Sequence, residues 1–176
     1  MNKKGCFHIY YGNGKGKTSV LNGMCLRAKG SNMNVKYLRF LKNMKTSEND
    51  MLSKIGVEVE NFYHFSKKFI WDMNPQEVEE FKVESLKGLE RLEQLLQDES
   101  VDLILVDELL GVIENGFFDK EHVVKIINNR KSNIEIAVSG RVIYEQMSEI
   151  ADLISEVKEI KHYYEKGVTA RKGIEY

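Results

Sequence analysis

The sequence is poor in residues that separate one folded unit from the next. One proline occurs in 176 residues, and no stretch has the glycine and serine content of a linker. Internal repeats and low-complexity segments are also missing, which excludes solenoids and disordered arrays. Because 42% of the residues are hydrophobic, one core of good size can form. We therefore expect residues 1–176 to form a single domain.

Three further scarcities restrict the partners and the location. The formal net charge is −1, so we expect no general attraction to nucleic acid or to an anionic membrane. No apolar run approaches the length needed to span a bilayer. The two cysteines, Cys6 and Cys25, fall in an expected strand and an expected helix, where reduced buried thiols are more common than a disulfide. These features predict a cytoplasmic protein without nucleic-acid or membrane partners.

A glycine-rich loop follows the first apolar run. Its residues are Gly12, Asn13, Gly14, Lys15, Gly16, Lys17 and Thr18. The glycines allow successive backbone N–H groups to point at phosphate oxygens, Lys17 adds a charge, and the Thr18 hydroxyl is the usual magnesium ligand. The first glycine lies one position later than in the common P-loop pattern. A ligand-free surface turn is the alternative, but the flanking strand and helix favour a phosphate site.

Short apolar runs alternate with segments of helical periodicity along the chain. The runs have strand length and cover residues 7–11, 35–41, 57–62, 101–106, 134–139 and 153–157. The clearest helix spans 75–96, with Asn74 and Pro75 as its start. This alternation predicts an α/β fold, a mostly parallel sheet with helices on both faces. Ligands of such folds bind at the carboxyl ends of the strands, where the glycine-rich loop lies.

The run at 101–106 ends in two carboxylates, Asp107 and Glu108. Two anions at the end of a buried strand repel each other unless a cation lies beside them, and Mg²⁺ bound to phosphates meets that need. We predict Thr18 and Glu108 as magnesium ligands, with Asp107 in direct contact with the ion or one layer behind. The alternative is that the two acids cap the next helix.

Several segments in the same order resemble the P-loop ATP:corrinoid adenosyltransferases of bacteria. They are the glycine-rich loop, Arg27, Phe40-Leu41-Lys42, Val106-Asp107-Glu108, Ser139-Gly140-Arg141, Ala151-Asp152-Leu153, Lys161-His162 and the closing residues 167–176. The closing Gly-Val-x-Ala-Arg-x-Gly-Ile-Glu-Tyr is the most diagnostic segment, because a general P-loop argument does not predict it. Members often carry a basic amino-terminal extension over the corrinoid, and we expect no such lid here.

The resemblance implies a RecA-like P-loop fold and a single nucleotide-binding adenosyltransferase domain. The implied reaction transfers the 5′-deoxyadenosyl group of ATP to the Co(I) of a reduced corrinoid, cobalamin or cobinamide, and releases tripolyphosphate. ATP would lie along the loop in the sense opposite to most P-loop enzymes. Lys17 would stabilise the leaving triphosphate and Arg27 would lie near the phosphates. A homodimer and a reduced flavoprotein electron donor are implied as well.

Two aromatic residues match the segment that prepares cobalt in this family. Phe69 and Trp71 would displace the lower axial ligand, and an apolar face below the corrin makes reduction of cobalt(II) easier. Without the resemblance, a core or interface position is the usual place for such residues.

Two other functions remain open from the sequence. A generic P-loop NTPase or nucleotide kinase would act at the γ-phosphate and release ADP, with Glu108 polarising a water. A non-catalytic carrier of adenosylated corrinoid would need Phe69 and Trp71 but would have little use for Lys17.

Overall fold

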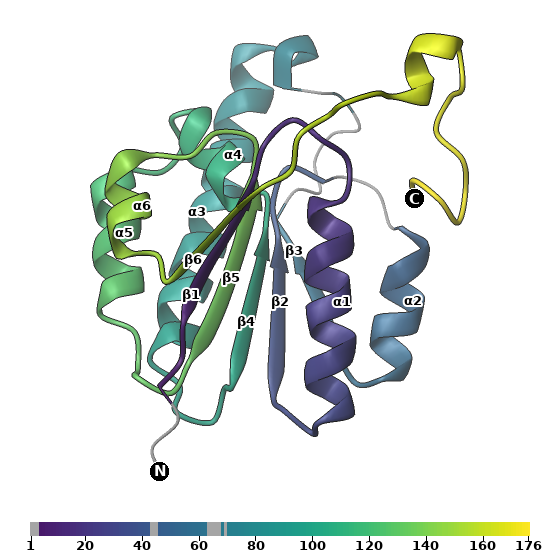
Figure 1. The fold of residues 1–176 in the computed structure, drawn as a ribbon. Coiled ribbons are helices and arrows are strands. Elements are labelled where there is room, and N and C mark those ends of the chain that lie inside the picture. The colour runs from purple at the N-terminus through teal and green to yellow at the C-terminus, as the bar shows by residue number, and fades with distance from the viewer. Residues whose placement is uncertain (1–3, 43–45, 63–67, 69) are drawn as a thin grey trace.

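The computed structural model describes residues 4–42, 46–62, 68 and 70–176, and the side chain of Trp71 is outside that description. Six parallel strands form one sheet in the order β3-β2-β4-β5-β1-β6 (Figure 1). The strands are β1 (Phe7–Tyr11), β2 (Val35–Arg39), β3 (Val59–Asn61), β4 (Leu103–Asp107), β5 (Glu135–Gly140) and β6 (Leu153–Glu156). Each of the six expected runs forms a strand, and the sheet of the described residues is entirely parallel.

Helices cover both faces of this sheet. They are α1 (Lys17–Gly30), α2 (Ser47–Lys54), α3 (Pro75–Leu96), α4 (Leu109–Glu114), α5 (Lys120–Asn128) and α6 (Glu145–Ile150), with short 3-10 turns at Ile70–Asp72 and Tyr163–Lys166. Figure 1 shows α1 and α2 on one face and α3, α4 and α5 on the other. The predicted α/β class with two covered faces is confirmed. The insertion of β5 between β1 and β4 is the strand order of RecA-like P-loop folds.

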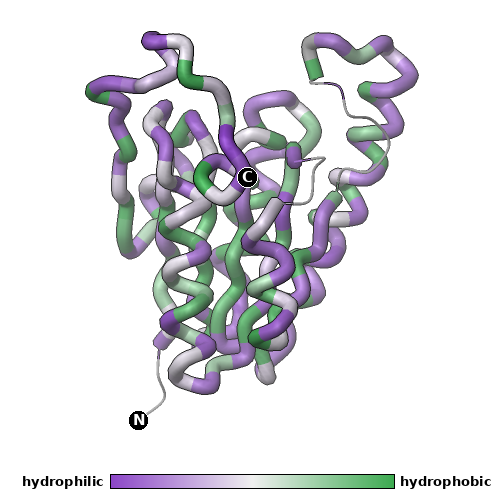
Figure 2. The backbone as a smooth tube through the Cα atoms, turned by 90° about the vertical axis from the view of Figure 1, so that its right-hand side faces the viewer, coloured by the Kyte–Doolittle hydropathy of each residue, from purple (hydrophilic) through white to green (hydrophobic). Residues whose placement is uncertain are grey.

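Alternation along the strands explains why both faces must be covered. In β4, Leu103 and Leu105 pack into the core beneath α1 and α2, whereas Ile104 and Val106 pack into the core beneath α3 to α6. All four are at most 2% exposed. Strands that are apolar on both sides stay folded only between two helical layers. Figure 2 shows these hydrophobic strands at the centre of the molecule.

Helix α3 begins where the sequence predicts. The Asn74 side chain accepts a hydrogen bond from the N–H of Glu77, and the Glu77 carboxylate accepts one from the N–H of Asn74. This reciprocal pair satisfies two N–H groups that the first helical turn leaves without partners. Within the described residues, no helix is both long enough and apolar enough to cross a membrane.

All parallel strands end at the same edge of the sheet, so the loops after β1, β2, β4, β5 and β6 meet there. Of the non-glycine residues with positive φ in the described part, two lie directly at this edge, Leu41 at 56° and Glu108 at 63°. Such conformations are costly and tend to occur at functional sites. After β6 the chain runs above this edge to the 3-10 turn Tyr163–Lys166, and the closing segment then turns back so that the carboxyl terminus lies at the start of α2 (Figure 1).

Candidate nucleotide site

The glycine-rich loop joins β1 to α1 and is held against two neighbouring segments. The N–H of Gly12 donates to the carbonyls of Gly140 and Arg141, both at 3.2 Å, and the N–H of Gly14 donates to the Val157 carbonyl at 2.8 Å. The N–H groups of Gly12 and Gly14 therefore donate hydrogen bonds within the protein. The first N–H groups of α1 have no partner within the helix, because helical geometry leaves them free to face an anion.

Close packing accounts for the glycines of this loop. Gly12 has a φ of 117°, and a Cβ there would lie 2.5 Å from the Val157 carbonyl oxygen. A Cβ on Gly14 would lie 2.7 Å from the carbonyl carbon of Lys158. Gly16 caps α1 with a φ of 125°. The loop thus needs glycine for its conformation at positions 12 and 16 and for its packing at 12 and 14.

The two lysines of the loop have different surroundings. Lys17 Nζ donates to the carbonyls of Gly12 at 2.6 Å and Gly14 at 2.9 Å. Burial lowers the pKa of Lys17, against the opposing effect of Glu108. Lys15 Nζ instead lies 2.5 Å from a carboxylate oxygen of Glu175, near the carboxyl end of the chain. Lys17 is therefore the loop lysine that faces the interior of the site.

Thr18 and Asp107 come together across the start of α1 and the end of β4. The Thr18 hydroxyl donates to Asp107 Oδ2 at 3.0 Å, and Lys42 Nζ contacts Thr18 Oγ1 at 2.6 Å and Asp107 Oδ2 at 2.5 Å. Ser139 Oγ donates to Asp107 Oδ1 at 2.6 Å. Burial by itself would raise the pKa of Asp107, but the bonded Lys42 ammonium, the Ser139 hydroxyl and the Arg39 charge hold it below its usual value.

Glu108 occupies the first position before α4. Its N–H donates to Ser139 Oγ at 3.0 Å, and its side chain makes no capping hydrogen bond to α4. Burial raises the pKa of Glu108, and the neighbouring Asp107 adds to that shift. Glu108 therefore holds the N-cap position of α4, but its carboxylate does not cap the helix, and the helix-cap alternative is wrong for this side chain.

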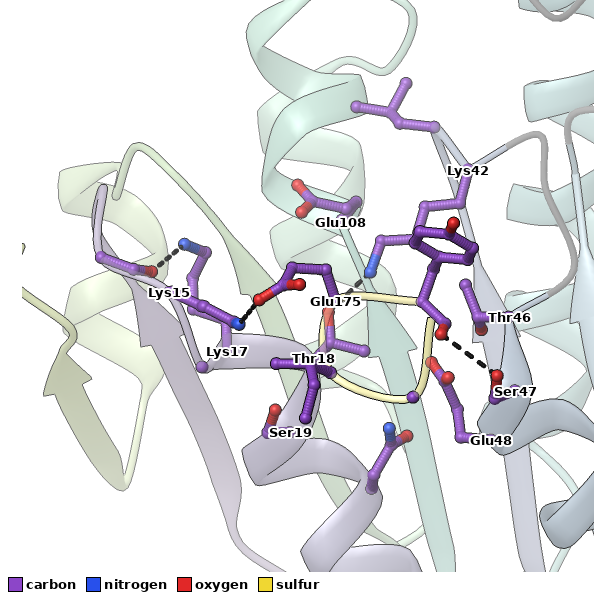
Figure 3. A pocket seen from close by; sticks show the side chains of 17 residues that line it. Lys15, Lys17, Thr18, Ser19, Lys42, Thr46, Ser47, Glu48, Glu108 and Glu175 are labelled. Atoms are coloured by element: carbon purple, nitrogen blue, oxygen red, sulfur yellow. Dashed lines mark hydrogen bonds and ion pairs between the residues drawn. The ribbon is translucent and has the colours of Figure 1, made fainter. Parts of the chain in front are cut away.

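Lys15, Lys17, Thr18, Lys42 and Glu108 line one pocket of about 750 Å³ (Figure 3), whereas the buried Asp107 and Ser139 are not part of its wall. Its wall consists of residues 14–19, 22, 41, 42, 46–48, 108 and 173–176. In Figure 3, Lys17, Thr18, Lys42 and Glu108 surround the same space, and Glu175 lies beside Lys15. A volume of this size suits a nucleotide-sized ligand.

Six residues of the predicted site are not found in the pocket wall: Gly12, Asn13 and Asp107 lie within two positions of residues that form it, and three others lie elsewhere or cannot be placed. Arg27 is in the last turn of α1, about 15 Å along the helix axis from Lys17, and is not part of the pocket wall. Phe69 lies outside the described residues. Trp71 belongs to the 3-10 turn Ile70–Asp72, and its side chain is not described.

Sequence reasoning assigned no role to Lys42, Ser139 or the closing residues 173–176. Lys42 lies three positions after the end of β2, and Ser139 is the next-to-last residue of β5, at the edge where ligands of parallel sheets bind. That position was the available signal. The closing segment was marked by the family resemblance, but nothing local indicates that it returns to the loop.

Comparison with known proteins decides the family. The family model described as "ATP:corrinoid adenosyltransferase BtuR/CobO/CobP" matches residues 3–176. The chain belongs to this family. The corrinoid adenosyltransferase of Escherichia coli K12 is 30% identical over 177 residues, which cover 100% of this chain and 88% of the relative. The corrinoid adenosyltransferase CobA of Salmonella typhimurium LT2 is 28% identical, with 99% of this chain and 87% of the relative covered.

One solved structure is similar to this chain at a lower level. Domain III of the replication initiation protein DnaA from Thermotoga maritima is 14% identical, with a TM-score of 0.46 over 89% of this chain and 55% of that chain. A likeness of this size carries no information on function. The resemblance to the adenosyltransferase family that the sequence motifs indicated is confirmed by the family match.

Proposed function

We propose that this protein is an ATP:corrinoid adenosyltransferase, which transfers the 5′-deoxyadenosyl group of ATP to Co(I) of a reduced corrinoid. The observation that carries the proposal is the family match from residue 3 to 176, which includes every segment of the pocket wall. In the reaction, the cobalt–carbon bond forms with the electron pair of Co(I). The bond from C5′ to its oxygen breaks, and that pair leaves on tripolyphosphate.

The residues of this chain would bind and orient the nucleotide. Lys17 and the first N–H groups of α1 would neutralise the triphosphate as it departs, because charge builds up there during C5′ transfer. The chain needs no nucleophile of its own, since cobalt is the nucleophile. Holding C5′ in line with the metal is then the main contribution of the site.

Magnesium fits the Thr18–Asp107 pair. Thr18 Oγ1 and Asp107 Oδ2 lie 3.0 Å apart, and the Lys42 ammonium group already contacts both oxygens. The position therefore suits a cation. Thr18 and Asp107 would hold the ion, with Glu108 on the wall of the same pocket. When bound, Mg²⁺ supplies positive charge to the leaving phosphates. The sequence favoured Glu108 as the partner of Thr18, whereas the hydrogen bonds favour Asp107.

The remaining properties stay proposals from the family resemblance. They are a homodimer, a reduced flavoprotein as electron donor, cytoplasmic location, Phe69 and Trp71 beneath the corrin, and Arg27 near the phosphates. One domain for residues 1–176 is proposed too, supported by the single six-stranded sheet.

One observation favours hydrolysis or phosphoryl transfer as a second candidate. Glu108 lines the pocket, and burial raises its pKa, which suits a group that accepts a proton from a water near the γ-phosphate. That reaction releases ADP.

A product assay tests the proposal. Anaerobic incubation with ATP, Mg²⁺ and chemically reduced cobalamin should yield the light-sensitive adenosylated product and an equal amount of tripolyphosphate. Lys17→Ala should lower the rate about 10²- to 10³-fold, the cost of removing one donor to a developing charge. Lys87→Ala, an exposed change on α3, is the matched control. Release of ADP without a cobalt–carbon bond would replace the proposal with the second candidate.

A further inference from the structure

An ammonium group occupies the cation position of the proposed magnesium site. Lys42 follows β2, and its Nζ lies 2.6 Å from Thr18 Oγ1 and 2.5 Å from Asp107 Oδ2. In Figure 3 the Lys42 side chain extends from the strand end into the pocket toward Thr18. These are the two oxygens that would ligate the metal, so Lys42 and a metal ion cannot bind them at the same time.

The surrounding charges explain why a cation is needed there even without metal. Asp107 is fully buried, and Ser139 already donates to its other oxygen. The Nε of Arg39, also fully buried, lies 3.9 Å from Asp107 Oδ2 and makes no hydrogen bond in the described residues. Arg39 is thus too far away to bond the carboxylate. Lys42 is the cation that does so, and an unpaired buried carboxylate would be costly.

Lys42 is also able to leave. Its side chain is 28% exposed, whereas those of Arg39 and Asp107 are 0% exposed. The side chain lines the pocket proposed for the triphosphate. A triphosphate brings several negative charges to that space and offers the ammonium group a new partner.

We propose that Lys42 closes the Thr18–Asp107 pair to free divalent cations and moves onto the triphosphate when Mg–ATP binds, so that metal binding requires nucleotide. The proposal rests on the proposed function for the identity of the nucleotide. The potential metal ligands of the chain are consistent with this proposal. Among the described residues, no group of three His, Cys, Asp or Glu side chains lies close enough together to hold a metal ion. An ion held by Thr18 and Asp107 then depends on phosphate oxygens for its other ligands.

A metal titration without nucleotide tests the first part. Mn²⁺ is added to the full chain, and free Mn²⁺ is measured by electron paramagnetic resonance. Lys42→Met should bind one Mn²⁺ about tenfold or more tightly than the unmodified protein, a difference of about 1.4 kcal/mol. Lys42→Arg retains the positive charge and should bind as weakly as the unmodified protein. Lys87→Met removes one exposed lysine charge far from the pocket and should also leave Mn²⁺ binding unchanged.

The outcomes separate a gate from a merely structural lysine. Equal Mn²⁺ affinity of Lys42→Met and Lys87→Met would overturn the proposal, and so would a gain for Lys42→Arg as large as that for Lys42→Met. Circular dichroism checks that the variants fold. If Lys42→Met does not fold, Lys42→Gln, which can still donate to Thr18 or Asp107, takes its place with the same expectation. The titration uses no ATP and no corrinoid, so failure of adenosyl transfer does not affect it.

A measurement on the unmodified protein tests the second part. The ¹⁵Nζ resonance of Lys42, assigned by its loss in Lys42→Arg, should stay in place when Mg²⁺ alone is added and shift when Mg–ATP is added. A shift with Mg²⁺ alone, or an unmoved resonance in the ATP-saturated protein, would overturn the proposal. Failure to bind ATP at all would instead count against the proposed function.

Discussion

Replacing Asp107 by asparagine should destabilise the protein by about 3 kcal/mol. The substitution removes the negative charge that Lys42 contacts at 2.5 Å and leaves two cations beside a neutral amide. Removing one partner of a buried ion pair costs roughly 3–5 kcal/mol. We expect the lower end of this range of free energies, because the Lys42 side chain is 28% exposed and can reorient toward solvent. Arg39 keeps its hydrogen bonds to Thr46 and Asn49.

This free energy corresponds to a measurable shift in melting temperature. For 176 residues the unfolding entropy is about 0.37 kcal/mol/K, so a loss of about 3 kcal/mol lowers Tm by about 8 °C. Urea denaturation in EDTA measures the free energy of unfolding without metal. Ser139→Ala, which removes one donor to the same carboxylate, is a milder comparison with an expected loss of about 1 kcal/mol.

The pH dependence gives the same prediction a second test. The pKa of Asp107 in the folded protein is lowered, because its bonded cation and hydroxyl outweigh burial. Its stabilisation is therefore complete above the unfolded-state pKa of about 3.9 and disappears as pH falls through the folded-state pKa. The difference in unfolding free energy between the unmodified protein and Asp107→Asn should be constant from about pH 5 to 8 and shrink below about pH 4. A difference under about 0.5 kcal/mol at pH 7, the size of an ordinary surface change, would refute the reasoning.

Two further predictions concern the glycine-rich loop and the wall of the pocket. Gly12→Ala should cost about 2 kcal/mol or more and abolish ATP binding, because φ is 117° and the new Cβ would lie 2.5 Å from the Val157 carbonyl oxygen. Gly23→Ala, in an open position within α1, should instead stabilise by about 0.7 kcal/mol. Deleting residues 173–176 should raise the KM for ATP about tenfold, equivalent to ~1.4 kcal/mol, since these residues form one wall.

Urea denaturation and ATP titration check the glycine variants, and normal ATP binding by Gly12→Ala would contradict the assigned loop packing. For the deletion, steady-state kinetics at varied ATP is the measurement, with Lys172→Ala as an exposed control in the same tail that lies outside the pocket wall. An unchanged KM would show that the tail does not contact the nucleotide.

Much of the fold was accessible from local patterns. The apolar runs, the glycine-rich loop and the start of α3 depend on residues within a few positions of one another. Strand alternation, the conformational freedom of glycine and the pairing of Asn74 with Glu77 all act over that range. The run ending in Asp107 and Glu108 likewise indicated an acidic strand end beside the loop.

The inner arrangement of the site was decided by the tertiary structure. Lys42 is 65 positions from Asp107, and Ser139 is 32 positions beyond Asp107, yet both bond its carboxylate. The strand order β2-β4-β5 makes them neighbours, and that order depends on how whole helices and strands pack. Lys15 meets Glu175 across 160 positions for a similar reason. The sequence alone therefore predicted which elements form and indicated a phosphate-binding loop between two of them, because those signals are local. Only the packed sheet decided which charge stands beside Asp107, because that contact joins the ends of strands far apart in the chain.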